Sequence, residues 1–137
     1  MAPNPLPTAL DILNRFYAAE KIYMSTPSDS RDFSGMGAVL SPSAQLIQSP
    51  DLPYGGTYVG HSGYLAWAEA MASYFDRVEP HDVTIYEESG GEGSSVVVSM
   101  KVNMRIRRTG REVEGLGVQI VKVDRERVLI VEMRPIY

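Results

Sequence analysis

The sequence of 137 residues contains no cysteine. Disulfide bonds, thiolate catalysis and cysteine-ligated zinc or iron–sulfur centres are therefore excluded. The two histidines, His61 and His81, lie twenty residues apart, and this spacing forms no metal-binding motif. We therefore expect a protein that uses neither a metal ion nor another cofactor.

The sequence also lacks a concentrated basic segment and a long hydrophobic run. The 13 Lys and Arg residues are outnumbered by 17 Asp and Glu residues, and apart from Arg105, Arg107 and Arg108 they are scattered. A nucleic-acid partner is not expected, because phosphate binding needs a concentrated basic surface. No apolar run approaches the ~18 residues that span a bilayer, and residues 1–13 lack the basic and apolar parts of a signal peptide. We therefore expect a cytoplasmic protein without a membrane partner.

The residues that are present indicate one globular domain. Hydrophobic residues make up 44% of the chain and charged residues 22%, which is an ordinary globular composition, and the length fits a single domain over 1–137. Thr8 and Asp11 predict a helix start by reciprocal capping, and Pro27 predicts the helix end. One face of this helix carries a carboxylate among apolar residues at spacings of three and four: Leu13, Phe16, Glu20 and Tyr23.

The rest of the chain predicts two further helices and a mainly antiparallel sheet. A short helix is expected within 33–40, short strands at 43–48 and 57–59, and a longer helix capped by Ser62. Four more strands, separated by Gly-rich or charged turns at 90–93, 109–110 and 124–126, are expected at 83–87, 96–107, 113–123 and 128–135. This order of elements predicts an α+β domain in which helices cover one face of the sheet.

Two of the expected strands indicate a pocket. Every second residue of 96–106 is apolar, including Met104, which predicts a strand with one dry face. In the next strand, Gly115 and Gly117 share a face with Gln119. Long strands twist and glycines let the sheet curl, and small residues on a concave face leave space. We therefore expect a pocket between sheet and helices, with Met104 on its wall and Gln119 as a neutral hydrogen-bond donor.

A family resemblance rests on two segments and on the order of the elements. The segments are PYGGTYVGHSG at 53–63, which leads into a helix, and VLIVEMRPIY at 128–137, the closing strand. Over nearly its whole length the chain resembles the NTF2-like superfamily, and within it the SnoaL-like branch. The resemblance implies a cone, in which a strongly curved sheet and three helices enclose a deep apolar cavity, and a homodimer formed through the outer face of the sheet.

The same resemblance implies a range of activities. The superfamily includes cofactor-free isomerases, cyclases, dehydratases and epoxide hydrolases that act on polyketides, terpenoids or steroids, and it also includes non-catalytic binding proteins. The fold alone does not choose among these functions. No catalytic signature of the family matches this sequence residue by residue, so the candidate site residues come from the sequence itself.

Aromatic residues are the strongest indication of a hydrophobic ligand. Tyr54, Tyr58, Trp67 and Tyr74 cluster around the Gly-rich stretch after residue 50, and Tyr17 lies on the first helix. The buried hydroxyl group of a tyrosine requires a hydrogen-bond partner, so we expect these rings to line the pocket and bind substrate. The alternative, that they belong to the core, applies most to Trp67.

Carboxylates beside arginines are the first candidates for acid–base catalysis, because an apolar cavity raises their pKa toward neutrality. Asp32 follows Arg31 on the loop after the first helix, and Glu132 precedes Arg134 in the closing strand. Either arginine could bind an anionic group or polarise a carbonyl of the substrate. The alternatives are a loop salt bridge for Asp32 and a surface Glu–Arg arrangement for Glu132.

Two further residues complete the catalytic candidates. His81 could act as a general base near neutral pH, although its place after Pro80 at a strand start is also typical of a surface histidine. Glu20 ranks behind the others, because a glutamate on a buried stripe can extend to solvent near the helix end.

These observations favour an enzyme with general acid–base chemistry. We expect a cofactor-independent isomerase or cyclase that acts on a hydrophobic secondary-metabolite intermediate of polyketide or terpenoid type. Dehydratase or other lyase chemistry also remains open. The alternatives are a non-catalytic small-molecule-binding module of the same fold and a dimerisation or scaffold domain whose own side chains fill the cavity.

Overall fold

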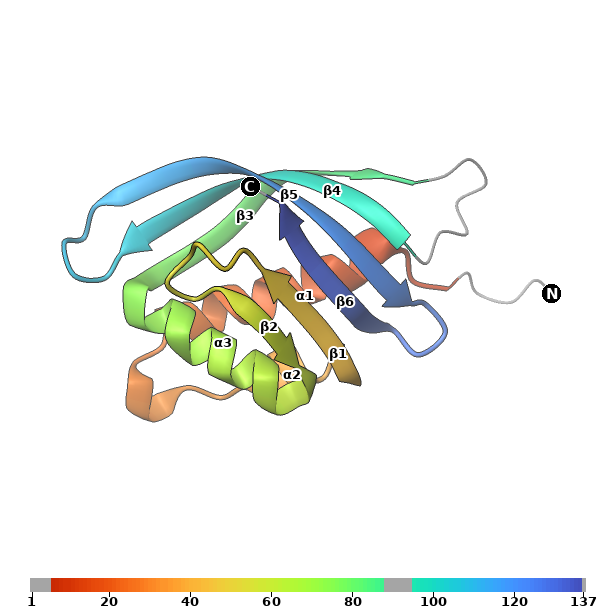
Figure 1. The fold of residues 1–137 in the computed structure, drawn as a ribbon, viewed down its shortest axis with the longest axis horizontal. Coiled ribbons are helices and arrows are strands. Elements are labelled where there is room, and N and C mark those ends of the chain that lie inside the picture. Colours follow the sequence, from red (N-terminus) through yellow and green to blue (C-terminus); the bar gives the residue numbers. More distant parts are fainter. Residues whose placement is uncertain (1–5, 88–94, 137) are drawn as a thin grey trace.

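The computed structural model describes residues 6–87 and 95–136, so the turn expected at 90–93 lies outside the described residues. Its elements, in chain order, are α1 (Ala9–Ser25), the 3-10 helix η1 (Ser28–Ser30), α2 (Ser34–Gly37), β1 (Leu40–Gln48), β2 (Gly56–Val59), α3 (Gly60–Tyr74), β3 (Phe75–Tyr86), β4 (Ser95–Ile106), β5 (Glu112–Asp124) and β6 (Leu129–Ile136). The strands form one sheet in the order β2-β1-β6-β5-β4-β3 (Figure 1). β1 and β6 run parallel, and the other neighbouring pairs run antiparallel. The expected α+β class with a mainly antiparallel sheet is confirmed.

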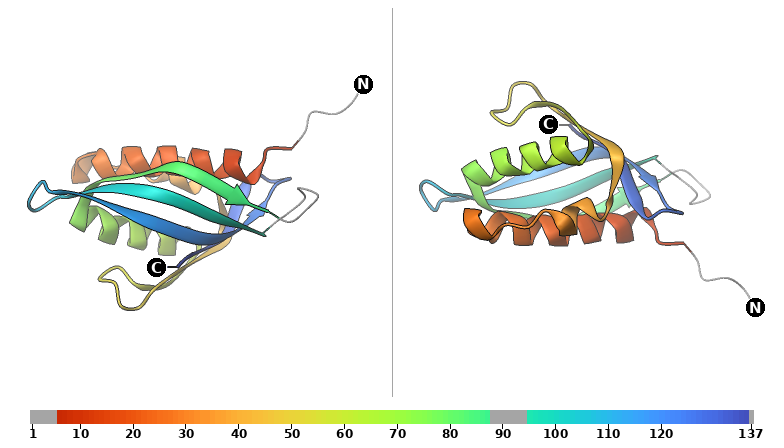
Figure 2. Two further views of the ribbon diagram at one scale, coloured as in Figure 1. Left: turned by 90° about the horizontal axis from the view of Figure 1, so that it is seen from above. Right: turned by 90° about the horizontal axis from the view of Figure 1, so that it is seen from below.

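The sheet curves strongly, and its helices lie on the concave side. Figure 2 shows α1 and α3 side by side beneath the long strands β3, β4 and β5. α1 packs mainly against β3 at one edge of the sheet, and α3 packs mainly against β1 near the other edge. The two helices and the curved sheet therefore form the expected cone, with its interior between them.

The start of α1 follows from its capping residues. The Thr8 hydroxyl accepts a hydrogen bond from the Asp11 backbone N–H at 3.1 Å, and the Asp11 carboxylate accepts one from the Thr8 N–H at 2.9 Å. These two bonds satisfy N–H groups that a helix leaves unpaired at its first turn. The helix ends at Ser25, before Pro27. Both predicted ends of the helix are confirmed.

The start of α3 differs from the prediction. Ser62 does not cap the helix, because α3 begins at Gly60 directly after Val59 and has no side-chain cap. Gly60 has φ +72°, and a β-carbon built there would meet the Pro42 carbonyl oxygen at 3.0 Å. Glycine therefore permits the tight turn from β2 into α3, a conformation that other residues seldom adopt.

The strand β3 is longer than the sequence predicted. It begins at Phe75, directly after α3, whereas the expected strand began at residue 83. Pro80 lies inside β3, and the pairing with β4 shifts register between His81 and Thr84, where Asp82 has φ +50°. A proline is tolerated here because β3 is an edge strand, so one side of it needs no ladder of hydrogen bonds.

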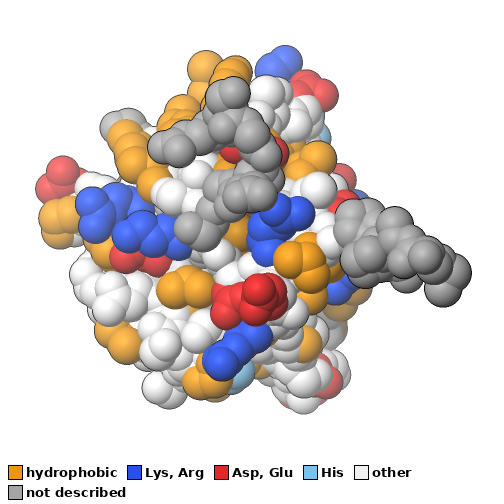
Figure 3. All heavy atoms as spheres, turned by 90° about the vertical axis from the view of Figure 1, so that its right-hand side faces the viewer, with side chains coloured by type: hydrophobic (Ala, Val, Ile, Leu, Met, Phe, Trp, Pro, Cys, Tyr) orange, Lys and Arg blue, Asp and Glu red, His pale blue; other side chains and the backbone are white. Residues whose placement is uncertain are grey.

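The two faces of the sheet differ in polarity as the alternation in the sequence predicted. Val96, Val98 and Met100 of β4 are buried toward the helices, and Met104 further along the same face is half-buried. The opposite, outer face carries ion pairs between strands: Arg77–Glu112 and His81–Glu114 join β3 to β5 across β4, and Lys122–Glu132 joins the neighbours β5 and β6. In the end view of Figure 3, basic and acidic side chains are likewise intermixed with hydrophobic ones.

Candidate functional site

A cavity of about 340 Å³ lies between the concave face of the sheet and the helices α1 and α3. The predicted pocket is therefore confirmed. Helices, strands and one loop all contribute to its wall. The wall includes Phe16, Tyr17 and Glu20 of α1, Trp67 and Met71 of α3, Gln48 of β1, Leu52 and Tyr54 of the β1–β2 loop, Met100 and Met104 of β4, Gly115, Gly117 and Gln119 of β5, and Met133 of β6.

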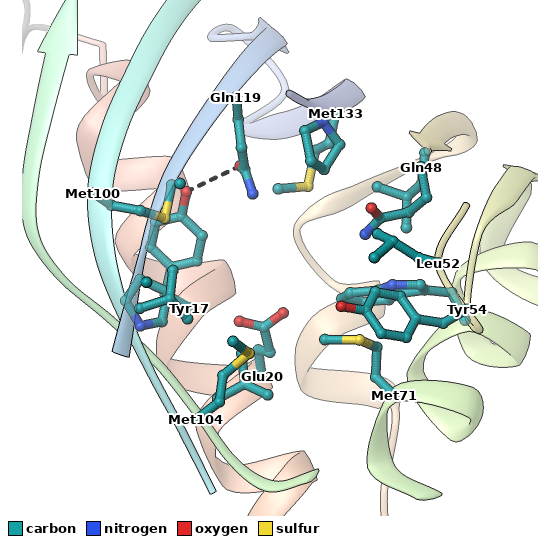
Figure 4. Close-up of a pocket in the computed structure, with 18 of the residues that line it drawn as sticks. Tyr17, Glu20, Gln48, Leu52, Tyr54, Met71, Met100, Met104, Gln119 and Met133 are labelled. Carbon is teal, nitrogen blue, oxygen red and sulfur yellow. Dashed lines mark hydrogen bonds between the residues drawn. The ribbon is translucent and has the colours of Figure 1, made fainter. Parts of the chain in front are cut away.

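The apolar part of the wall is adaptable. Four methionines contribute to it, Met71, Met100, Met104 and Met133, and Figure 4 shows them on opposite sides of the cavity. Methionine has a flexible, polarizable side chain that fits irregular apolar and aromatic groups. Gly115 adds open space, because a β-carbon built there would meet no atom within 4 Å. This wall can therefore fit hydrophobic ligands of different shapes.

Glu20 is the charged residue of this wall among the described residues. Its side chain is 5% exposed, and Figure 4 shows the carboxylate pointing into the cavity near Tyr17 and Met104. In the described part of the chain the carboxylate has no hydrogen-bond or ion-pair partner. Burial raises the pKa of Glu20 from 4.5 to about 8, because an apolar environment disfavours the charged form. The carboxyl group can therefore take up or release a proton near neutral pH.

A hydrogen bond joins two other polar residues of the wall. The Tyr17 hydroxyl donates to the Gln119 side-chain oxygen at 3.3 Å (Figure 4). This bond turns the amide so that its oxygen is engaged and its two N–H groups remain for a ligand. Burial, and then the charge of Glu20, raise the pKa of Tyr17, so its hydroxyl stays protonated as a donor. Tyr17, Glu20, Gln48 and Gln119 thus supply polar side chains to a mostly apolar wall.

Among the predicted substrate-binding residues, some line the cavity and others lie beside it. Tyr17, Tyr54, Trp67, Met104 and Gln119 belong to the wall.

Tyr58 and Tyr74 lie behind the wall. The Tyr58 hydroxyl donates to the carbonyl oxygens of Tyr54 at 3.0 Å and Gly55 at 3.3 Å, so it fixes the β1–β2 loop. Tyr74 is 44% exposed, and its ring centroid lies 6.3 Å from that of Tyr54. Both tyrosines therefore support a loop that carries wall residues.

Asp32 and Arg31 lie away from the cavity wall. The Asp32 side chain is exposed, and its carboxylate accepts a hydrogen bond from the Ser34 backbone N–H at 2.9 Å, which lowers its pKa. The Arg31 side chain is 8% exposed, lies over the Tyr23 ring and forms an ion pair with Glu69 of α3 at 3.5 Å. The two residues are neighbours in sequence but have separate partners, one in α3 and one at the start of α2, as expected for the segment that connects α1 to α2.

His81, Glu132 and Arg134 also lie away from the cavity wall. His81 of β3 contacts Glu114 of β5 at 2.5 Å, across the strand β4 that lies between them. Glu132 of β6 forms an ion pair with Lys122 of β5 at 3.7 Å. Arg134 is exposed on β6, whereas its neighbour Met133 lines the cavity. The alternation of β6 therefore directs Met133 inward and the two charged residues outward.

From the sequence, Glu20 was the last of the catalytic candidates, and Gln48 was not predicted. The signal for Glu20 was present, because this residue lies on the buried stripe of α1. Gln48 ends β1 and is buried, and Figure 4 shows its amide directed toward the cavity. The available signal for Gln48 was alternation, because Gln48 lies on the same face of the strand as Ala44 and Leu46.

Residues 6–87 and 95–136 also bear on metal binding and on a membrane. No group of three or more His, Cys, Asp or Glu side chains in these residues is placed to hold a metal ion. No helix in the same residues is long and apolar enough to cross a bilayer.

Comparison by sequence identifies no relative of the chain. No protein-family model matches it, and no curated protein matches it either. Comparison by structure, in contrast, gives 231 matching chains.

Three of these structures represent the matches. A candidate polyketide cyclase from Pseudomonas putida KT2440 has a TM-score of 0.71 at 16% identity, over 96% of this chain and 92% of that chain. An NTF2-like protein of unknown function from Burkholderia pseudomallei K96243 has a TM-score of 0.68 at 20% identity, over 93% and 88%. A protein of ketosteroid-isomerase-like fold from Catenulispora acidiphila DSM 44928, in complex with trimethylamine, has a TM-score of 0.70 at 13% identity, over 96% and 87%. The chain therefore has the NTF2-like fold, in agreement with the resemblance drawn from its sequence.

Proposed function

We propose that the protein is a cofactor-independent isomerase or cyclase that acts on an uncharged hydrophobic small molecule, with Glu20 as the group that moves the proton. The observation that carries this proposal is the buried Glu20 carboxylate, which points into an apolar cavity without a partner in the described part of the chain. A buried, unpaired carboxylate lowers stability, so its presence in a cavity wall is best explained by chemistry on a ligand.

The proposed reaction begins with removal of a proton next to a carbonyl group. Glu20 in its ionised form takes the proton from carbon, and the electron pair of the C–H bond moves onto the carbonyl oxygen to form an enolate. The Gln119 amide N–H groups, oriented by the Tyr17 hydroxyl, donate hydrogen bonds to the developing oxyanion.

The enolate then has two outcomes. Return of the proton from Glu20 to a different carbon of a conjugated enolate gives an isomer. Attack of the enolate carbon on a second carbonyl of the same molecule forms a ring, and the new alkoxide takes the proton from Glu20. A carboxyl pKa near 8 serves both steps, because such a group is a stronger base than an exposed glutamate and still returns its proton.

The test of this proposal is proton exchange on ring ketones in deuterated water. Wild-type protein is expected to accelerate exchange of the protons next to the carbonyl, with a rate that rises with pH up to about 8 as Glu20 ionises. Glu20→Gln is expected to lower the rate by ~100-fold or more, the usual scale of acid–base catalysis. Glu114→Gln, which changes a carboxylate on the outer face of the sheet, is the matched control and should leave the rate unchanged. Equal rates for wild type and Glu20→Gln would reject the role of Glu20.

A second candidate function is non-catalytic binding of a hydrophobic amine. A neighbour of the same fold is in complex with trimethylamine, and in this chain Glu20 lies in a wall that also contains Phe16, Tyr17 and Trp67. An ammonium group binds favourably both to a carboxylate and to aromatic faces. Calorimetry with trimethylamine at pH 7 and pH 8.5 distinguishes this function. Binding that strengthens with pH as Glu20 ionises, together with no acceleration of exchange on any ring ketone, would favour it.

The proposed assembly is a homodimer formed through the outer face of the sheet. Leu116 is 82% exposed there, and the exposed Val97, Val118 and Ile136 lie on the same face, with Val118 directly opposite Ile136. Exposed apolar patches of this kind mark interaction surfaces. Sedimentation equilibrium should give twice the chain mass of 15.1 kDa, and Val118→Glu should shift the protein toward the monomer. A wild-type monomer at micromolar concentration would contradict the dimer.

A further inference from the structure

Tyr54 carries a hydroxyl group without a hydrogen-bond partner in the cavity wall. The residue is 9% exposed, and within the described part of the chain its hydroxyl forms no hydrogen bond. The oxygen is nevertheless accessible, because Trp67 Nε1 is the one side-chain nitrogen or oxygen atom of the described residues that is both fully buried and unpaired. Figure 4 shows the Tyr54 hydroxyl directed into the cavity. A ligand in the cavity can therefore reach this group.

The β1–β2 loop holds the backbone of Tyr54 in this position. The Leu52 N–H donates to the Ser49 carbonyl oxygen at 3.2 Å, and the Gly55 N–H donates to the Leu52 carbonyl oxygen at 2.9 Å. Glycine is required at Gly55, because a β-carbon there would clash with the Ser49 carbonyl oxygen. The Tyr58 hydroxyl binds the Tyr54 carbonyl oxygen at 3.0 Å. The loop is thus a compact turn whose own hydrogen bonds fix the residue.

Two aromatic neighbours hold the ring of Tyr54. Its centroid lies 6.2 Å from that of Phe75, edge-on, and 6.3 Å from that of Tyr74. Burial raises the pKa of Tyr54 above its ordinary value, so the hydroxyl stays protonated at neutral pH and can donate. The donor is therefore already in place before a ligand binds, and this lowers the ordering cost of a hydrogen bond to it.

The donors of the wall lie on two sides of the cavity. Figure 4 shows Gln119 on the side of Tyr17, its hydrogen-bond partner, and Tyr54 on the opposite side. In the proposed proton transfer the Gln119 amide binds the carbonyl next to the reacting carbon, which leaves the Tyr54 hydroxyl for another acceptor. A ligand that pairs both donors therefore carries two acceptor oxygens, one toward each side.

We propose that the Tyr54 hydroxyl donates a hydrogen bond to a second carbonyl oxygen of the ligand, so that the cavity selects ring compounds with two carbonyl groups over those with one. This inference rests on the proposed function, because it names the substrate class of the same cavity. It makes Tyr54 a specificity residue that binds the carbonyl group away from the proton transferred by Glu20.

The test compares 1-decalone with the decalindiones, which share its two-ring skeleton and carry a second carbonyl group on the other ring. In calorimetry, wild-type protein should bind at least one dione roughly 5- to 10-fold more tightly than 1-decalone, the scale of one hydrogen bond made in a buried site. Tyr54→Phe keeps the packed ring and removes the hydroxyl, and the ratio of the two affinities should fall to about one. Tyr74→Phe, the same change on a ring behind the wall, is the matched control and should keep the wild-type ratio.

Three results would overturn the inference: a wild-type protein that prefers no dione, a preference that Tyr54→Phe retains, and equal losses in Tyr54→Phe and Tyr74→Phe. Binding is measured without turnover, so the result is separate from the proton-exchange test of Glu20. A preference that only Tyr54→Phe removes would support the inference even if Glu20→Gln left exchange unchanged. A ratio unaffected by Tyr54→Phe would leave the role of Glu20 in place.

A second measurement observes the hydrogen bond itself. A carbonyl carbon whose oxygen accepts a hydrogen bond gives a carbon NMR signal shifted downfield, so a dione labelled at both carbonyl carbons reports on each group separately. Compared with the wild-type complex, the Tyr54→Phe complex should show one of the two signals moved upfield and the other unchanged. Two signals that keep their wild-type positions in Tyr54→Phe would show that the hydroxyl does not bind the ligand, and would reject the proposal.

Discussion

The two sides of the sheet treat carboxylates in opposite ways. On the outer face, Glu112, Glu114 and Glu132 each lie against a basic side chain of another strand. On the concave side, Glu20 lies in an apolar cavity with no such partner among the described residues. Paired, solvent-exposed carboxylates contribute little to stability, and a buried unpaired carboxylate lowers it. The comparison teaches that the position of a carboxylate relative to a cavity is a better guide to a proposed acid–base group than an adjacent arginine in sequence.

The largest effect expected from this comparison is on the pH dependence of stability. Because the pKa of Glu20 is raised from 4.5 to about 8 on folding, the folded state binds the proton more tightly than the unfolded state. The free energy of unfolding therefore falls as the pH rises from about 4.5 to about 8. The fall is at most ~1.4 kcal/mol for each pH unit.

Glu20→Gln removes this loss. The variant should be more stable than wild type by ~2–3 kcal/mol at pH 9 and similar to it at pH 4, as measured by urea unfolding. Glu114→Gln on the outer face is the control and should follow the wild-type curve. A Glu20→Gln curve parallel to that of wild type would show that Glu20 keeps an ordinary pKa.

An intermediate effect is expected where glycine leaves the cavity open. Gly115→Val places a side chain in space where a β-carbon meets no atom within 4 Å, in a strand that favours β-branched residues. Affinity for three-ring ketones should fall ~10-fold, which corresponds to ~1.4 kcal/mol, while affinity for 1-tetralone and the melting temperature stay near wild type. Equal losses for ligands of both sizes would place Gly115 outside the binding volume.

The smallest effect is expected for a paired carboxylate at the sheet's outer side. The Arg105 guanidinium beside Asp76, at 2.7 Å, lowers the pKa of that carboxyl. The resulting stability is present above the ordinary pKa of an aspartate and is lost as the pH falls below it. Asp76→Asn should lower the free energy of unfolding by less than ~1 kcal/mol at pH 7 and have no effect near pH 2. A loss several times larger would remove the contrast between the two sides of the sheet.

Local sequence signals predicted much of the fold. The reciprocal capping of Thr8 and Asp11 predicted the start of α1, and strict alternation predicted the dry face of β4. The start of β3 could not be predicted, because no glycine or proline separates Tyr74 from Phe75 where the helix becomes a strand. Tertiary pairing with β4 decides that boundary.

The candidate site was only partly predictable, because it depends on contacts between residues far apart in sequence. Tyr54, Trp67 and Gln119 were predicted for the cavity wall from aromatic clustering and from the glycine-rich face of β5. Arg31 beside Asp32 suggested a catalytic pair, yet the arginine binds Glu69 of α3. A helical stripe alone does not distinguish a residue that faces the core from one that faces a cavity.

The most direct test of the account is a measurement of the Glu20 pKa in the ligand-free protein. Carbon NMR of selectively labelled glutamate side chains, with Glu20→Gln to assign the signal, follows this one carboxyl group through a pH titration. We predict a midpoint near 8 for Glu20, well above the ordinary value of 4.5. A midpoint near 4.5 would mean that the carboxylate is solvated or paired in solution, and it would contradict the proposed role of Glu20.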